Sequence, residues 1–254
     1  MPETERAAAD TQRTLVFKIG GLRLTGAPAV LASMGVGAFI FLLVYRSRPS
    51  AAGILSGVLW ITFVAYWSAT AKNASATKSS ESKASRGVHE NLLVASFLFL
   101  FIPIPGLTAR FLPESNIFVV AGLVVQALFL LLAVWARRNL GRNWSGAVTV
   151  TVDRQLVRSG PYGLIRHPIY TAMLGMFAGT AIRSGELHAL IGFLLLTAAY
   201  VRKIRIEEDS LRGVFGAEYD GYSRTTGALV PRGTTILFGA IVVAGLILYA
   251  IRFR

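Results

Sequence analysis

Long apolar runs are the feature that most restricts what this chain can fold into. Of its 254 residues, 54% are hydrophobic and 15% are charged, which is typical of membrane proteins rather than soluble globular domains. A helix needs about 17 to 25 apolar residues to cross a bilayer. Four uninterrupted runs meet that length, at 27–45, 51–71, 91–108 and 115–136. These runs predict four membrane-spanning helices.

A fifth apolar region, 168–201, is interrupted by the polar sequence Arg-Ser-Gly-Glu at 183–186. This interruption predicts two short helices, 168–182 and 187–201, joined by a tight turn. A last run at 234–251 predicts a further helix. The expected fold is therefore an all-α integral membrane protein of about seven hydrophobic helices, two of which form the short hairpin.

The distribution of basic residues predicts an orientation. The segments that alternate with the predicted spans on the side of the N-terminus hold 4, 4, 6 and 6 of the 26 lysines and arginines, at 1–26, 72–90, 137–167 and 202–233. Positive charge marks cytoplasmic loops, so we expect a multi-pass protein with a cytoplasmic N-terminus, in keeping with a bacterial inner membrane. The Ser- and Lys-rich segment 72–90 is expected to be a flexible cytoplasmic loop.

Composition argues against several classes of function. The chain has no cysteine and three dispersed histidines, a poor set of ligands for a metal ion. Its net charge of +13 comes from residues that flank apolar runs, as in the loops of inner-membrane proteins. We therefore expect neither a metal site nor nucleic-acid binding.

Two polar segments contain the residues best suited to chemistry. The first runs from Gly160 to Tyr170, with the sequence GPYGLIRHPIY. Pro168 suits the first position of a helix, which places His167 at the helix start, where an imidazole can bond a ligand or a carboxylate. The alternative is that the tyrosines and arginine of this segment anchor the chain at the membrane interface.

The second polar segment, RKIRIEE at 202–208, is expected on a helix that continues from 187–201. Lys203 and Glu207 are four residues apart and share a helix face, while Arg205 and Glu208 are three apart. The alternative here is a set of intrahelical salt bridges on a solvated helix end, each contributing about 0.3 to 0.5 kcal/mol.

Taken together, the motifs resemble the isoprenylcysteine carboxyl methyltransferase family, which is related to phospholipid N-methyltransferases. The resemblance covers roughly residues 137–231, and the four N-terminal spans carry no matching motif. Its parts, in order, are LGRNWS at 140–145, LVRSGPY at 156–162, RHPIY at 166–170, Glu207-Glu208, Phe215-Gly216, Glu218-Tyr219 and Tyr222.

The resemblance implies an S-adenosylmethionine pocket on the cytoplasmic side and a lipophilic or lipid-modified substrate that enters from the bilayer. The cofactor-binding residues carried over by motif are Gln155, Leu156, Val157, Tyr162, His167, Pro168, Ile169, Tyr170, Glu207 and Glu208. The family's substrate-binding arginine lies four residues before the cofactor glutamate, where this chain has Lys203. Lys203 and Arg205 are the residues we expect to orient the substrate.

The chain is accordingly interpreted as a polar cytoplasmic tail (1–26), a four-helix transmembrane region (27–136), a methyltransferase core (137–233) and a C-terminal transmembrane helix (234–254). The expected reaction is methylation of a carboxylate on a lipophilic substrate. Two alternatives remain open. One is N-methylation of a phospholipid or amine, and the other is a non-catalytic membrane protein whose basic face binds lipid.

Overall fold

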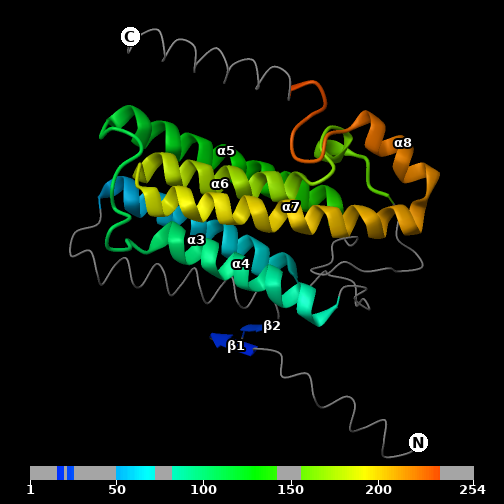
Figure 1. Cartoon of the computed structure of the whole chain (residues 1–254), viewed down its shortest axis with the longest axis horizontal. Helices are drawn as coiled ribbons and strands as arrows, with labels where there is room; N and C mark the ends of the chain where they lie inside the picture. Colours follow the sequence, from blue (N-terminus) through cyan, green and yellow to red (C-terminus); the bar gives the residue numbers. More distant parts are fainter. Residues whose placement is uncertain (1–15, 20–21, 26–49, 72–81, 142–155, 235–254) are drawn as a thin grey trace, which may run out of the picture.

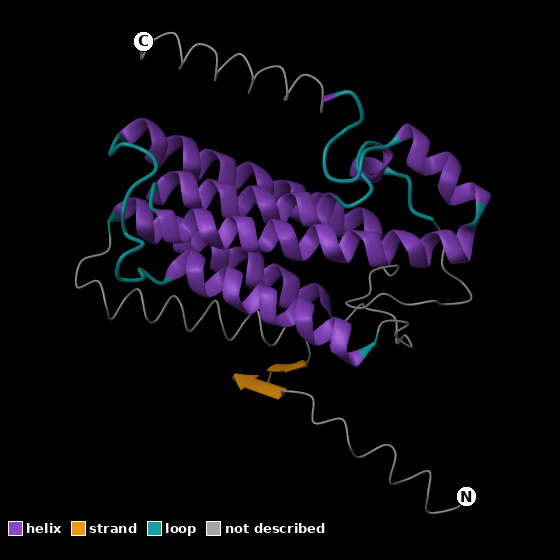
Figure 2. Cartoon of the chain, in the orientation of Figure 1, coloured by secondary structure: helices purple, strands orange, loops and turns teal. Residues whose placement is uncertain are grey.

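The computed structural model describes residues 16–19, 22–25, 50–71, 82–141 and 156–234. Its elements are shown in Figures 1 and 2. They are the strands β1 (Val16–Ile19) and β2 (Leu22–Thr25), the helices α3 (Ala51–Ala71), α4 (Lys83–Phe101) and α5 (Asn116–Leu140), the short 3₁₀ helix η2 (Gly160–Gly163), and the helices α6 (Pro168–Ser184), α7 (Leu187–Phe215) and α8 (Ala217–Thr225).

The five long helices lie side by side as a bundle in which successive helices run in opposite directions (Figure 1). The pairs in contact include α5 with α6, α4 with α7, α6 with α7, and α3 with α5. The end of α5, the start of α6 and the end of α7 therefore meet at one end of the bundle. The short helices η2 and α8 lie at that same end (Figure 2).

The prediction of a helical membrane protein is confirmed. Among the described residues, three helices are long and apolar enough to cross a membrane, at Ala51–Thr70, Asn116–Leu140 and Leu187–Phe215. Helix α5 exposes a stripe of large apolar side chains spaced three or four residues apart, which suits contact with lipid: Ile117, Val120, Val124, Leu128, Leu131 and Trp135. The predicted spans 27–45 and 234–251 lie outside the described residues, so the number seven stays a prediction.

Three elements differ from the sequence prediction. The expected loop 72–90 is helical from Lys83, because α4 begins there and continues to Phe101. Its start is capped by the hydroxyl of Ser82, which accepts a hydrogen bond from the backbone N–H of Ser85, and such a cap satisfies a free donor of the first turn. The strands β1 and β2, paired antiparallel, were not predicted within the segment 1–26.

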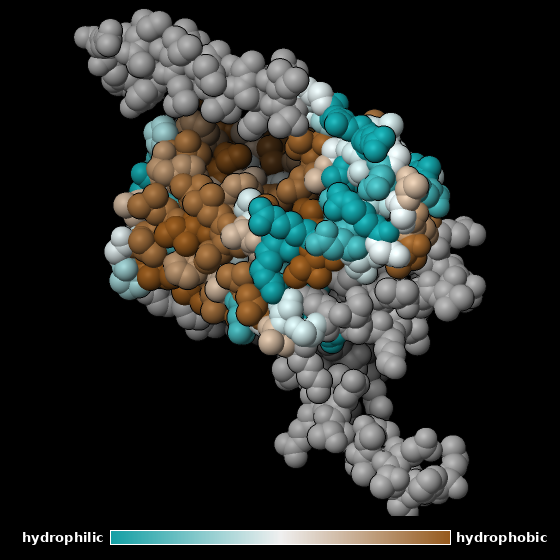
Figure 3. Space-filling model, turned by 45° about the vertical axis from the view of Figure 1, so that its right-hand side comes forward, coloured by the Kyte–Doolittle hydropathy of each residue, from teal (hydrophilic) through white to brown (hydrophobic). Residues whose placement is uncertain are grey.

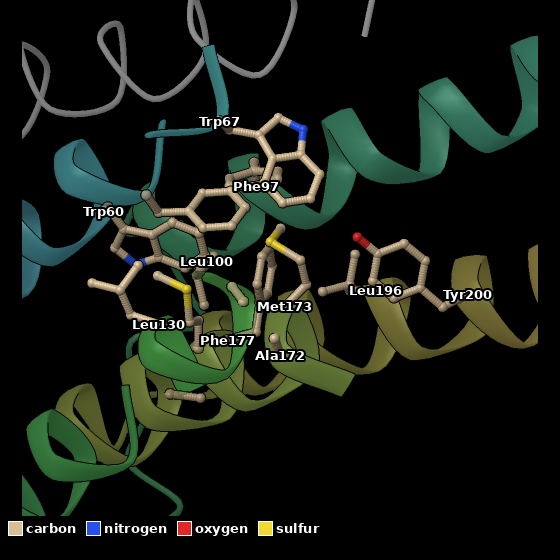
Figure 4. Packing of buried hydrophobic residues seen from close by; sticks show 14 of the residues in the cluster. Trp60, Trp67, Phe97, Leu100, Leu130, Ala172, Met173, Phe177, Leu196 and Tyr200 are labelled. Atoms are coloured by element: carbon tan, nitrogen blue, oxygen red, sulfur yellow. The ribbon is translucent and has the colours of Figure 1, made fainter. Parts of the chain in front are cut away.

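An aromatic cluster occupies the centre of the bundle (Figure 4). The ring of Trp60, on α3, lies 5.6 Å from Phe97 on α4 and 5.5 Å from Phe177 on α6, each pair edge to face. The indole N–H of Trp60 donates to Thr180 Oγ1 at 3.1 Å, so its one polar atom is satisfied within the core. These contacts join three helices at a single residue.

Helices α5 and α6 approach so closely that their backbones touch. A Cβ atom built on Gly122 would lie 2.5 Å from the carbonyl oxygen of Gly179, and one built on Gly179 would lie 2.6 Å from the carbonyl oxygen of Gly122. Small residues that allow such close approach are common between membrane helices. This contact holds α6, whose first turn carries several predicted site residues, against α5.

Polar and apolar surfaces are separated along the bundle. Hydrophilic residues gather over the end that carries α8, and apolar residues cover much of the rest of the described surface seen in Figure 3. The described basic residues of 156–167 and 202–233 lie at this polar end, as the positive-inside argument requires for a shared face. Both sequence motifs are thus brought to one place.

Candidate functional site

The turn before α6 is held by backbone hydrogen bonds to a later segment of the chain. Backbone N–H groups of Arg166 and His167 donate to the carbonyl oxygens of Gly227 and Ala228, at 2.8 and 3.0 Å. The N–H of Gly227 donates in return to the carbonyl of Leu164 at 3.2 Å. As predicted, Pro168 occupies the first position of α6, directly after His167. We call residues 226–229 the strap, because they fix the backbone that positions His167.

Two adjacent glutamates of α7 face this turn. Glu208 Oε1 accepts from Arg166 Nε at 2.8 Å and lies 3.2 Å from His167 Nε2. Glu207 Oε2 accepts from the hydroxyl of Tyr170 at 2.9 Å and lies 3.7 Å from His167 Nδ1. The imidazole of His167 therefore stands between the two carboxylates, with one ring nitrogen toward each.

The two carboxylates differ in how many hydrogen bonds and ion pairs they form with the protein. Glu208 is surrounded by Arg166, His167 and, at 3.9 Å, Arg212, and its side chain is 12% exposed. Glu207 accepts one hydrogen bond, is 20% exposed and has no cationic partner other than His167 within the described residues. An ionised carboxylate can accept about four hydrogen bonds. Glu207 is therefore the carboxylate with room for a further donor.

Tyrosines line the site on two sides. The ring of Tyr170 stacks on His167, with centroids 5.5 Å apart, and on Tyr200 at 4.5 Å. On α8, the hydroxyl of Tyr222 donates to the carbonyl of Tyr162 at 2.6 Å, and burial raises the pKa of Tyr222 to about 12. Burial also raises the pKa of Tyr219. Both α8 phenols are therefore neutral hydrogen-bond donors at pH 7.

Most residues predicted to bind the cofactor come together. Tyr162, His167, Pro168, Tyr170, Glu207 and Glu208 lie at the junction of η2, α6 and α7. Ile169 is half-buried, as are Leu156 and Val157 in the segment that leads to η2. Gln155 lies outside the described residues.

The two residues expected to orient the substrate are separated. Lys203 is buried on the face of α7 that carries Glu207, one turn away, whereas Arg205 is exposed. At 3.6 residues per turn, Arg205 points roughly opposite to both of these side chains. The ion pair with Glu208 that the sequence suggested for Arg205 is formed by Arg166 instead.

Sequence reasoning missed three contributors to the site. Arg166 was assigned only a possible anchoring role, yet its Nη1 also donates to the carbonyl oxygens of Ser223 and Thr226. Tyr222 had no assigned role. The strap carries no motif, although the hydroxyl of Thr171 donates to the carbonyl of Leu229 at 2.7 Å. Backbone contacts of this kind leave no side-chain pattern in the sequence.

Comparison with known proteins finds similarity to membrane methyltransferases. Residues 117–218, which include nearly all of α5 and the whole of α6 and α7, match the family model of phospholipid methyltransferases. A probable protein-S-isoprenylcysteine O-methyltransferase of Oryza sativa subsp. indica is 28% identical over 118 residues, which are 45% of this chain and 58% of the relative. Over this segment the chain is therefore similar to phospholipid and isoprenylcysteine methyltransferases.

Other similar proteins carry a different kind of name. The cobalt-zinc-cadmium resistance protein CzcN of Cupriavidus metallidurans is 33% identical over 96 residues, 37% of this chain and 44% of the relative. The chain thus spans less than two thirds of the curated relatives it matches. A solved eukaryotic intramembrane Ras methyltransferase, isoprenylcysteine carboxyl methyltransferase, aligns with 80% of this chain and 84% of its own at 20% identity, with a TM-score of 0.42.

Proposed function

We propose that the chain is an S-adenosylmethionine-dependent methyltransferase that acts on a lipophilic acceptor at the polar end of the bundle. The observation that carries this proposal is the unequal use of the two glutamates. Glu208 is paired with Arg166 and His167 and lies close to Arg212, whereas Glu207 accepts one hydrogen bond and retains acceptor capacity beside neutral phenols. A carboxylate in that condition suits the α-ammonium of the cofactor. Tyr170 and His167 add stacked ring surface next to it.

The cofactor supplies a methyl group on a positively charged sulfur. The acceptor oxygen forms a bond to this methyl carbon as the carbon–sulfur bond breaks, and the sulfur keeps the electron pair as a neutral thioether. A carboxylate acceptor is already ionised at pH 7, so it needs no base. The residues of the chain have to hold the two reactants in line and exclude water. The rigid α5–α6 contact and the strap suit that task.

A carboxylate acceptor is the first candidate, in keeping with the name of the Oryza relative. The family model, which is that of phospholipid methyltransferases, favours a second candidate, an amine acceptor. An amine reacts only when neutral, so its methylation would rise steeply with pH below the amine's pKa, whereas a carboxylate would be methylated at a nearly constant rate above pH 6. A pH profile of methyl transfer separates the two.

The name of CzcN refers to metal resistance, but the described residues contain no candidate metal site. No group of three or more histidine, aspartate and glutamate side chains there could hold a metal ion. The cluster of His167 with Glu207 and Glu208 is instead closed by the guanidinium of Arg166, which would repel a cation. We therefore assign the site to an organic cofactor.

Replacing Glu207 with glutamine is expected to weaken binding of S-adenosylhomocysteine by a factor of ten or more. The change removes the anion while keeping the shape, and a hydrogen bond to a charged group contributes about 1.5 to 3 kcal/mol. Calorimetric titration of the detergent-solubilised protein measures the effect.

Asp209→Asn is the matched control for this experiment. Asp209 lies two residues further along the same helix and its side chain is 77% exposed, so the variant should bind like the parent. Equal loss in both variants would attribute the effect to general charge rather than to a site. Absence of binding to the folded parent protein would contradict the proposed function itself.

A further inference from the structure

The first two turns of α4 are attached to α7 next to the candidate site. Arg202 donates from Nη2 to the hydroxyl of Ser85 at 2.8 Å and from Nη1 to its carbonyl oxygen at 3.2 Å. One turn further along α4, the ring of His89 lies 6.0 Å from that of Tyr200, which stacks on Tyr170. These contacts make α4 a wall of the site, although it lies outside the segment matched by the family model.

Arg86 lies on the side of α4 that faces the interior of the bundle. It precedes Phe97 by eleven residues, or three turns, so both side chains leave the helix in nearly the same direction. Phe97 packs against Phe177 of α6 with ring centroids 4.9 Å apart. Arg86 therefore points toward the same interior, three turns closer to the polar end, where α6 begins and α7 carries Glu207.

One nitrogen of the Arg86 guanidinium is buried without an acceptor among the described residues. This nitrogen, Nε, donates no hydrogen bond there. Glu90 lies one turn further along α4, yet the two form no ion pair among those residues. A buried donor without an acceptor costs roughly 1 to 3 kcal/mol, and more when it is charged. Such a donor next to a candidate site is suited to an anion that binds there.

The chemistry of Arg86 matches what the rest of the site lacks. A guanidinium presents two parallel N–H groups that fit both oxygens of a carboxylate, whereas lysine offers only a point charge. On α7, the position one turn before Glu207 is occupied by Lys203, which is buried on the same face. The neighbouring cation, Arg202, is used to hold α4. Arg86 is the guanidinium directed inward from the opposite wall.

We propose that Arg86 binds the carboxylate of a lipophilic methyl acceptor, so that the acceptor is held between α4 and α7 with Lys203 nearby. This inference rests on the proposed function, because it assigns the acceptor side of the same site. Arg202 and His89 act as positioning residues that hold α4 in place.

The test uses the whole protein in detergent, saturated with S-adenosylhomocysteine so that no methyl transfer occurs. Binding of N-acetyl-S-farnesylcysteine is compared with binding of its neutral methyl ester. The parent should prefer the acid by about tenfold or more, the amount expected for a charge-assisted bidentate contact. Arg86→Gln should remove that preference while binding of S-adenosylhomocysteine changes less than twofold. Arg86→Lys should retain part of the preference.

Arg224→Gln is the matched control, because Arg224 is exposed on α8 at the same end of the molecule, and this variant should keep the parent's preference. The assignment is overturned if the parent does not prefer the acid, or if Arg86→Gln still prefers it. It is also overturned if Arg86→Gln loses cofactor-product binding and thermal stability together, since Arg86 would then be structural. Failure of the parent to bind S-adenosylhomocysteine would instead overturn the proposed function.

Discussion

Arg166→Ala should lower the free energy of unfolding by about 3 kcal/mol or more. The side chains of Arg166 and Glu208 are 11% and 12% exposed, and removing one partner of a buried pair leaves the other charge uncompensated, which typically costs about 3 to 5 kcal/mol. The variant also frees the carbonyl oxygens of Ser223 and Thr226. Denaturation of the detergent-solubilised protein, followed by tryptophan fluorescence, measures the change.

Arg158→Ala is the control for Arg166→Ala. Arg158 pairs with Glu218 at 2.8 Å, the same distance as in the buried pair, but these side chains are 45% and 58% exposed. Exposed pairs contribute about 0 to 1 kcal/mol, so this variant should unfold almost like the parent. Hydrogen exchange adds a second measurement, because only Arg166→Ala should speed exchange in the strap. Similar losses in the two variants would contradict the importance assigned to burial.

Gly179→Ala is expected to destabilise the protein by about 2 kcal/mol or more, although it adds a single methyl group. The new Cβ would lie 2.6 Å from backbone atoms of both Gly122 and Gln126 on α5. Backbone atoms of a packed helix cannot rotate away, so the helices must separate, and overpacking of this kind costs about 1 to 3 kcal/mol or more. The midpoint of thermal unfolding in detergent provides the measurement.

The same substitution at Gly213 should stabilise the protein instead of destabilising it. Gly213 lies within α7, and a Cβ built there meets no atom within 4 Å. Alanine in a helix is favoured over glycine by roughly 0.5 to 1 kcal/mol, so Gly213→Ala should unfold at a higher temperature than the parent. If Gly179→Ala were equally stable, the close contact of α5 and α6 would not be a determinant of the fold.

The presence of most helices could be predicted from the sequence, because helix formation depends on local apolar runs and turn residues. The run 51–71 predicts α3 with the bounds that the structure has, and the turn at 183–186 is formed where Gly185 takes a left-handed φ of 66°. The start of α4 was not predicted, because a Ser- and Lys-rich segment has no apolar periodicity. The cap at Ser82 and the attachment of Ser85 to Arg202 are tertiary and local hydrogen bonds that override that composition.

Which residues meet at the candidate site was largely predictable, but their pairings were not. Helical spacing correctly puts Lys203 and Glu207 on one face of α7, yet it cannot say which groups approach from another helix. Two arginines precede Glu208 as candidate partners, Arg205 by three residues and Arg166 by 42. In the structure, Glu208 pairs with the more distant Arg166. The difference between Glu208, which has several partners, and Glu207, which keeps acceptor capacity, therefore arises only once the helices are packed.

The length of α7 links the site to the bilayer itself. Its 29 residues extend about 43 Å at 1.5 Å per residue, against a hydrocarbon core of about 30 Å. Glu207 lies 20 residues after Leu187, so about 30 Å of unbroken helix separates it from the opposite end. A thicker bilayer would draw the carboxylate toward hydrocarbon or tilt the helix. Lipid acyl-chain length should therefore change the affinity for the proposed cofactor by shifting or tilting α7, without any contact between lipid and cofactor.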